Sequence, residues 1–337
     1  MDNYLKFATF QSPEWIPVGL SILPAAWLKW GGALENIVLA HPQIFPDYRK
    51  GDFRNMKLSG LYTRGKKTDE WGCVWDSVAE GYDSICIGHP VKTREDIHAL
   101  RIPEVDAGLP HGFMFLRLTY LRGYEECMID FAEEPPELDI LIGKVLEYNI
   151  RQVRIRLASM KRKEYLISFG DDLGMQTMLP TGPLKWRKYL KPCFAGLYGL
   201  CKQAGKLVYM HSDGCIYEII PDLRDCGVDI VNPQFRANGL DNLTAACRGE
   251  GRYKIAVNLD LDRQMFPFAS PAEIEEHIML CVQALGSREG GLALSAECAA
   301  DVPLDNVEAI CCGLEKARMF FSKRSYGFGV EAKEKHD

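Results

Sequence analysis

The sequence has no cysteine pattern that would form a disulfide framework, although it contains twelve cysteines. They are scattered without a CxxC pair, in a chain too long to need covalent cross-links. We therefore predict a reducing, cytoplasmic compartment in which most cysteines pack as small apolar residues. The start, MDNYLKFATF, also lacks the basic and apolar blocks of a signal peptide. No window reaches the ~18 uninterrupted apolar residues of a membrane span, so we expect no membrane partner.

The sequence also lacks an excess of positive charge and the glycine motifs that bind phosphate. The formal net charge is -6, and a nucleic-acid surface would need clustered lysine and arginine. Neither GxGxxG nor GxxxxGK[ST] occurs, so nothing supports a nucleotide-binding turn. These absences argue against nucleic-acid partners and weaken the case for an open, doubly wound sheet.

Short apolar segments that alternate with helix-like segments are plentiful. From residue 111 onward each predicted strand is followed by a predicted helix, which indicates parallel strands. HGFMFLRLTYL, residues 111–121, is predicted to be one of these strands. Residues 51–110 form an irregular, β-rich excursion with turns. No linker divides the chain, so we predict a single (β/α)8 TIM barrel domain over residues 1–337.

Polar residues stand where the predicted strands end. In a barrel the active site is built from residues at the carboxyl ends of the strands. We therefore expect the site to contain Asp171, Asp172, His211, Asp213, Gln234, Asn258, Asp260, Glu297 and Cys298.

Three interpretations of these polar residues remain open. A catalytic zinc site could use His211, Asp213 and Cys298, because zinc takes three protein ligands and keeps one open position. Alternatively, Asp171 or Asp172 and His211 could perform acid–base chemistry without a metal. Asp171 could also serve only to bind helix or loop amides.

The pair Trp27 and Trp30 is open in a similar way. These residues are three positions apart on one predicted helix face. They belong either to the core or to an aromatic wall that binds substrate.

The same residues carry a family resemblance. The segments TDEWGCVW, LRGYEECMIDFAEEPPEL, GDDLGMQ, HSDG and ECAADVPLDNVEAI occur in this order between Trp71 and the end of the chain. With them the sequence resembles the uroporphyrinogen decarboxylase superfamily, which contains decarboxylases and corrinoid-linked methyltransferases. The resemblance implies a barrel fold.

The resemblance also indicates a branch of that superfamily. The decarboxylases carry arginines near the N-terminus for the acidic substrate, but LPAAWLKWGGALENIVLAHPQIF has none. The methyltransferase branch has a zinc site of one histidine and two cysteines. His211 and Cys298 match it, and Asp213 stands where the family has a cysteine. Cys215 or Glu297 could complete the site instead.

A carboxylate ligand leaves zinc a stronger Lewis acid than a second thiolate would. The resemblance therefore implies an O-demethylase type of methyltransferase. It would move a methyl group from a small donor, such as a methoxylated aromatic, to the cobalt of a separate corrinoid protein. Asp172 or Asp260 would protonate the leaving oxygen, and the substrate would lie near Trp27, Trp30, Gln234 and Asn258. The alternatives are a metal-free decarboxylase of a small acid and a relative that only binds a ligand.

Overall fold

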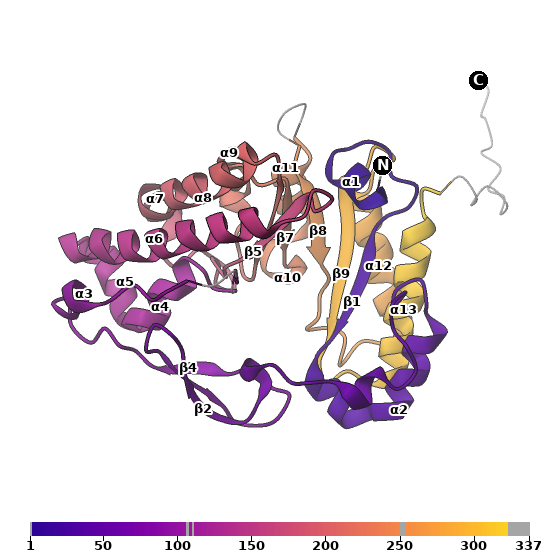
Figure 1. Cartoon of the computed structure of the whole chain (residues 1–337). Helices are drawn as coiled ribbons and strands as arrows, with labels where there is room; N and C mark the ends of the chain where they lie inside the picture. Colours follow the sequence, from indigo (N-terminus) through magenta and orange to yellow (C-terminus); the bar gives the residue numbers. More distant parts are fainter. Residues whose placement is uncertain (1, 106–107, 110, 250–253, 323–337) are drawn as a thin grey trace, which may run out of the picture.

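The computed structural model describes residues 2–105, 108–109, 111–249 and 254–322. Its centre is a parallel six-stranded sheet in the order β1-β9-β8-β7-β6-β5, which is curved in Figure 1. Consecutive strands from β5 to β9 are direct neighbours, as expected for repeated strand–helix units. The strands are β1 (Val18–Ile22), β5 (Leu166–Gly170), β6 (Leu207–Ser212), β7 (Ile230–Pro233), β8 (Ala256–Asp260) and β9 (Leu292–Cys298).

Helices follow each strand and lie on the outside of the sheet (Figure 1). A capping box begins one of them, since Ser270 accepts from the Glu273 amide and Glu273 accepts from the Ser270 amide. The helices after strands are α2 (Pro24–Ala40), α7 (Gly182–Lys185), α8 (Lys191–Gln203), α9 (Ile220–Cys226), α10 (Phe235–Asn238), α11 (Leu240–Cys247), α12 (Pro271–Leu285) and α13 (Leu304–Met319).

The sheet has one apolar and one polar face, because side chains alternate along each strand. In β6, Val208 and Met210 are buried against the helices, whereas Tyr209 and His211 are only partly buried on the opposite face. Helix α1 (Asn3–Ala8) covers this second face at the amino-terminal ends of the strands, where Phe7 packs with apolar residues of β7, β8 and β9. The polar face is therefore left open only toward the carboxyl ends of the strands.

The predicted strand over residues 111–121 is wrong. Most of it forms helix α4 (Phe115–Arg122). The carboxylate of Asp171 accepts hydrogen bonds from the amides of Met114, Phe115 and Leu116 at 3.2, 2.5 and 2.9 Å. These bonds supply partners for amides at the start of a helix. Phe115 and Leu118 are buried at a spacing of three residues, which suits a helix rather than a strand.

The predicted closed (β/α)8 barrel is consequently confirmed only in part. The structure shows a mixed α/β fold with a parallel sheet. Within the residues that it describes, no strand joins β1 to β5. In the sequence, the helices α3 (Asp96–Ala99), α4, α5 (Tyr124–Glu133) and the long α6 (Pro136–Ser159) lie between these two strands.

A small antiparallel sheet occupies part of the segment for which a β-rich excursion was predicted. It consists of β2 (Gly65–Thr68), β3 (Val74–Ser77) and β4 (Ile85–Gly88). Figure 1 shows it on the side where the parallel strands end. The chain passes very close to α2 here, since a Cβ on Gly81 would lie 2.8 Å from the Ala25 nitrogen. Among the described helices, none has the length and apolar character needed to cross a membrane.

Candidate functional site

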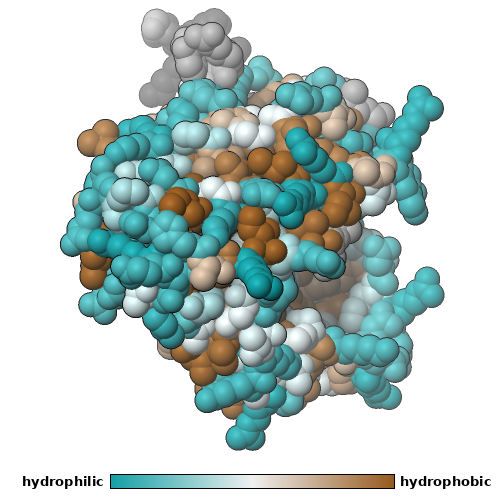
Figure 2. All heavy atoms as spheres, turned by 60° about the vertical axis from the view of Figure 1, so that its left-hand side comes forward, coloured by the Kyte–Doolittle hydropathy of each residue, from teal (hydrophilic) through white to brown (hydrophobic). Residues whose placement is uncertain are grey.

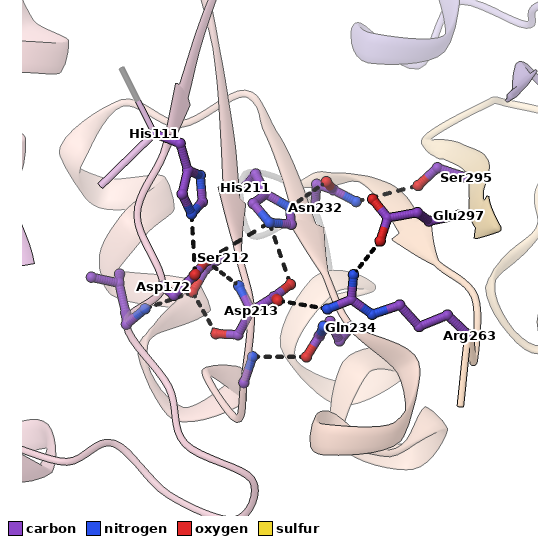
Figure 3. Close-up of polar contacts among 12 residues, drawn as sticks. His111, Asp172, His211, Ser212, Asp213, Asn232, Gln234, Arg263, Ser295 and Glu297 are labelled. Carbon is purple, nitrogen blue, oxygen red and sulfur yellow. Dashed lines mark hydrogen bonds and ion pairs between the residues drawn. The ribbon is translucent and has the colours of Figure 1, made fainter. Parts of the chain in front are cut away.

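A continuous network of charged side chains lies at the carboxyl ends of β5, β6 and β9 (Figure 3). It runs from His111 through Asp172, His211, Asp213 and Arg263 to Glu297. The two histidine rings are 5.5 Å apart between centroids. With both histidines protonated, anions and cations alternate along this network, so each charge has an opposite charge beside it.

His211 is held in one orientation by the neighbouring strand. The amide nitrogen of Asn232 donates to the carbonyl oxygen of Asn258 at 2.6 Å. The Oδ1 atom of Asn232 is therefore left to accept from Nδ1 of His211, at 2.7 Å. This bond places a proton on Nδ1 and directs Nε2 toward Asp213 and Asp172, at 3.3 and 3.8 Å. An imidazole fixed in this way presents Nε2 to a metal ion or a substrate.

His111 completes the other end of the arrangement. Its Nε2 lies 3.1 Å from Oδ2 of Asp172. The ring packs directly against the backbone of β5, because a Cβ on Gly170 would lie 2.5 Å from Nδ1 of His111. Only glycine leaves room for the imidazole at this position.

The loops that follow β5 and β6 contact each other through their main chains. The amide of Asp213 donates to Oδ1 of Asp172 at 3.0 Å. The amide of Cys215 donates to the carbonyl of Met175 at 2.7 Å. A Cβ on Gly214 would lie only 2.1 Å from the carbonyl oxygen of Gly174. The two loops therefore fix the position of both aspartates.

The charges of the site shift the pKa values of its members. Burial alone would lower the pKa of His211, but the bond to Asp213 and the nearby Asp172 outweigh burial and raise it to about 9. Burial tends to raise the pKa of Asp172, yet His111 holds it below its usual value. Burial raises the pKa of Asp260 to about 7, despite the opposing charges of Arg263 and His211. Asp260 can thus carry a proton near neutral pH. Burial raises the pKa of Asp171 to about 7 as well, but its oxygens accept from the amides of α4.

His111, Asp172 and His211 form a cluster that could hold a metal ion. One ligand atom from each lies within 4.8 Å of the other two. Two ligands of a tetrahedral zinc ion are about 3.3 Å apart, given zinc–ligand bonds of about 2.0 Å. Nε2 of His111 lies 3.1 Å from Oδ2 of Asp172, and Nε2 of His211 lies 3.8 Å from the other oxygen, Oδ1; both separations are within about 0.5 Å of this value. Oδ1 of Asp213, 3.3 Å from Nε2 of His211, could supply a fourth ligand.

The structure does not bring Cys298 to the two other predicted metal ligands. Side chains alternate along β9, so Ser295 and Glu297 are partly exposed on the polar face, whereas Ala296 and Cys298 are buried on the other. Cys298 faces α13, and its thiol is close enough to Cys311 to help raise the pKa of the Cys311 thiol. Burial raises the pKa of Cys298 to about 12, so its thiol stays protonated. The alternative candidate Cys215 is buried in the β6 loop, and Glu297 is paired with Arg263.

The residues with predicted substrate roles occupy different places. Gln234 accepts from the Gly214 amide at 2.9 Å and supports the β6 loop. Asn258 donates to the hydroxyl of Tyr209 at 2.9 Å, deeper in the polar face. Trp27 stacks between Tyr48 and Phe53, with centroids at 5.5 and 5.9 Å.

Trp30 is partly buried against the core, and the Lys29 ammonium lies over its ring. Both tryptophans therefore take part in packing around α2.

His111 and Arg263 were missed as members of the site. His111 precedes a helix and not a strand end, so the pattern of polar residues after strands could not find it. Arg263 follows Asp260 by three residues. The need for a cation among Asp213, Asp260 and Glu297 is the only sequence signal for it.

A cavity of about 630 Å³ adjoins the network of charged side chains. Arg263 and Glu297 reach it from the site, while Asp83 of the excursion, Arg236 and the loop after β8 form other walls. Phe268 stands at its rim with 88% of its surface exposed. Figure 2, turned by 60° from Figure 1, shows a hollowed face on which apolar groups lie between hydrophilic ones. The site is therefore accessible to a small molecule.

Comparisons with known proteins give little beyond this geometry. No protein-family model and no curated protein matches the sequence. Among solved structures, the fold is similar to a B12-independent methionine synthase from Shewanella sp. W3-18-1 in complex with selenomethionine. The identity is 11%, the TM-score is 0.35, and the match covers 78% of this chain and 76% of that one. At this TM-score the likeness carries no argument about function, and the resemblance to the uroporphyrinogen decarboxylase superfamily stays a prediction.

Proposed function

We propose that the chain is a zinc-dependent methyltransferase that moves a methyl group from a small donor, such as a methoxylated aromatic, to the cobalt of a separate corrinoid protein. The observation that carries the proposal is the cluster of His111, Asp172 and His211 at the carboxyl ends of the strands. The donor type and the corrinoid partner rest on the sequence resemblance.

The residues present fit a zinc ion, with a ligand set that differs from the one predicted. His111, Asp172 and His211 would hold the metal, and Asp213 is close enough to join them. These are nitrogen and oxygen donors, and zinc accepts such ligands as readily as it accepts thiolates. When bound, zinc supplies Lewis acidity toward the oxygen of the methyl donor. Asn232 keeps Nε2 of His211 directed toward the same point.

The two predicted catalytic aspartates take different roles in this proposal. Asp172 is paired with His111 and has a lowered pKa, so it acts as an anionic ligand. Asp260 has a pKa near 7 because it is buried. It can therefore give a proton to the donor oxygen that has lost its methyl group.

A metal-free decarboxylase remains the second candidate, and one observation favours it. The carboxylates of Asp172, Asp213 and Glu297 are already paired with His111, His211 or Arg263. Arg236 and Arg263 also line the cavity, where they could bind the carboxylate of a small acid.

Metal analysis and a transfer assay distinguish the two candidates. We expect protein purified without added metal to carry zinc, and to demethylate some methoxylated aromatics with free cob(I)alamin as methyl acceptor. Treatment with a chelator should stop this transfer, and zinc should restore it. Zinc-free protein that decarboxylates small acids in the presence of chelator would instead establish the second candidate.

The pH dependence of zinc affinity follows from the pKa of His211. Zinc needs the unprotonated Nε2, but the raised pKa of about 9 keeps His211 protonated at neutral pH. Each zinc ion must therefore displace a proton from His211, and, against the effect of burial, Asp172 also raises the pKa of the second ligand, His111. Affinity should thus rise at least about tenfold per pH unit between pH 7 and 9 and then level off. Competition with a calibrated chelator at several pH values measures this. Asp213→Asn removes the main cause of the raised pKa and should move the plateau to lower pH. An affinity independent of pH over this range would show that His211 is no ligand.

Gly170→Ala tests the position of His111. The added Cβ would lie 2.5 Å from Nδ1, so the ring must move away from Asp172. We expect zinc affinity to fall about tenfold or more, as when the supports of a ligand are disturbed. Gly19→Ala is the matched control, because Gly19 also lies in a parallel strand and a Cβ there meets nothing within 4 Å. Equal zinc affinities of the two variants would contradict the role of His111.

A further inference from the structure

A second group of metal-ligating side chains lies far along the chain from the first, between the end of α2 and the outer face of α13. It consists of His41, Glu308 and Cys312, whose ligand atoms all lie within 4.8 Å of one another. Nε2 of His41 is 3.1 Å from Oε1 of Glu308, which is 4.0 Å from the sulfur of Cys312. Figure 1 shows α2 and α13 side by side.

The imidazole of His41 is buried between two carboxylates. Its Nδ1 lies 3.2 Å from Oε2 of Glu315, an ion-pair distance that lacks hydrogen-bond geometry, while Nε2 faces Glu308. A neutral imidazole has one N–H and can donate to only one of them. With the proton on Nδ1, toward Glu315, the lone pair of Nε2 faces the oxygen of Glu308. A cation between these two atoms removes the repulsion.

A proton could serve as that cation, but it would bind only His41 and Glu308 and would not interact with Cys312. A divalent metal ion would serve His41, Glu308 and Cys312 together. The 3.1 Å between Nε2 and Oε1 is close to the separation of about 3.3 Å across tetrahedral zinc. Glu315 would then complete the carboxylate–histidine–metal arrangement that fixes the imidazole in many metal sites.

Helical spacing presents these ligands to solvent on one face. Glu308, Cys312 and Glu315 are separated by four and three residues in α13. Glu308 has 46% of its side chain exposed and Cys312 is half-buried, whereas the adjacent Cys311 is fully buried in the core. A metal ion can thus reach the ligands from outside.

We propose that His41, Glu308 and Cys312 bind a divalent metal ion of the zinc type, with Glu315 orienting the imidazole. On binding, the thiol of Cys312 loses its proton and the thiolate becomes a ligand. This site is independent of the function proposed above, because it shares no residue with the His111, Asp172 and His211 cluster.

Cobalt(II) binding to the metal-free, full-length protein tests the proposal. A thiolate ligand gives cobalt(II) a charge-transfer band in the near ultraviolet, whereas the His111, Asp172 and His211 cluster contains no cysteine. We expect the wild type and His211→Ala to show this band and Cys312→Ser to lack it. Absence of the band from the wild type, or its persistence in Cys312→Ser, would overturn the proposal.

Zinc dialysis of surface variants gives a second measurement that does not require changing the buried His41. Glu308→Gln loses a charged ligand, and Glu315→Ala loses the support of the imidazole. Each should weaken zinc binding about 10- to 100-fold at this site. Glu147→Gln is the control, because Glu147 pairs with Arg151 on α6, outside the cluster. Equal affinities in all three variants would count against the site.

Discussion

His211→Ala is expected to lose the zinc of the His111, Asp172 and His211 cluster and to lower methyl transfer about a thousandfold, whereas Cys298→Ala keeps both at the wild-type level. In the proposed reaction the metal would stabilise charge in the transition state by several kcal/mol, and about 4 kcal/mol corresponds to a thousandfold change in rate. Nε2 of His211 faces Asp172 and Asp213 across the cluster. Cys298 is buried on the opposite face of β9, so its removal should affect packing alone.

The measurements are zinc per chain, in a Cys312→Ser background that removes the second proposed site, and the initial rate of transfer to cob(I)alamin. Circular dichroism confirms that both variants fold. His111→Ala provides an independent check, because it removes a ligand that the sequence did not indicate. The opposite pattern, with zinc retained by His211→Ala and lost from Cys298→Ala, would restore the ligand set inferred from the family resemblance.

Asp171→Ala should lower the free energy of unfolding by about 3 kcal/mol. Asp171 is fully buried, and its carboxylate accepts three amide hydrogen bonds at the start of α4. Its removal leaves these amides without a partner, and each unsatisfied buried donor costs about 1 kcal/mol or more. Because the same segment carries His111, zinc affinity should fall as well.

Urea denaturation of the zinc-free protein measures the stability change separately from metal binding. Asp301→Ala is the control, since Asp301 is exposed at the rim of the cavity and its replacement should change stability by less than about 0.5 kcal/mol. A loss below about 1 kcal/mol in Asp171→Ala would show that water satisfies the amides, and that Asp171 does not determine α4.

The sequence was sufficient to place the strand ends at which the site forms. β6 through β9 are short apolar runs, and each run meets polar residues where the strand ends, as with His211 and Asp260. This signal is local, because side-chain alternation and the change of polarity are both present within a few residues.

Interactions between distant segments could not be predicted in the same way. Residues 111–121 are apolar enough for either a strand or a helix, and the carboxylate that favours a helix comes from Asp171, more than fifty residues later. His111 joins the site only because Gly170 leaves space for its ring. The orientation of Cys298 was available from its alternation with Glu297, but the resemblance to a cysteine-containing zinc site pointed the other way.

The contact between Gly174 and Gly214 would limit the ionic radius that the proposed metal cluster accepts. Asp172 and Asp213 stand on loops whose backbones touch at these glycines, so the spacing of the two carboxylates cannot widen without separating the loops. A large ion such as calcium needs six to eight oxygen ligands at 2.3–2.6 Å, whereas zinc needs four at about 2.0 Å. We therefore expect the cluster to discriminate against calcium by size, and substitution of either glycine to weaken that discrimination.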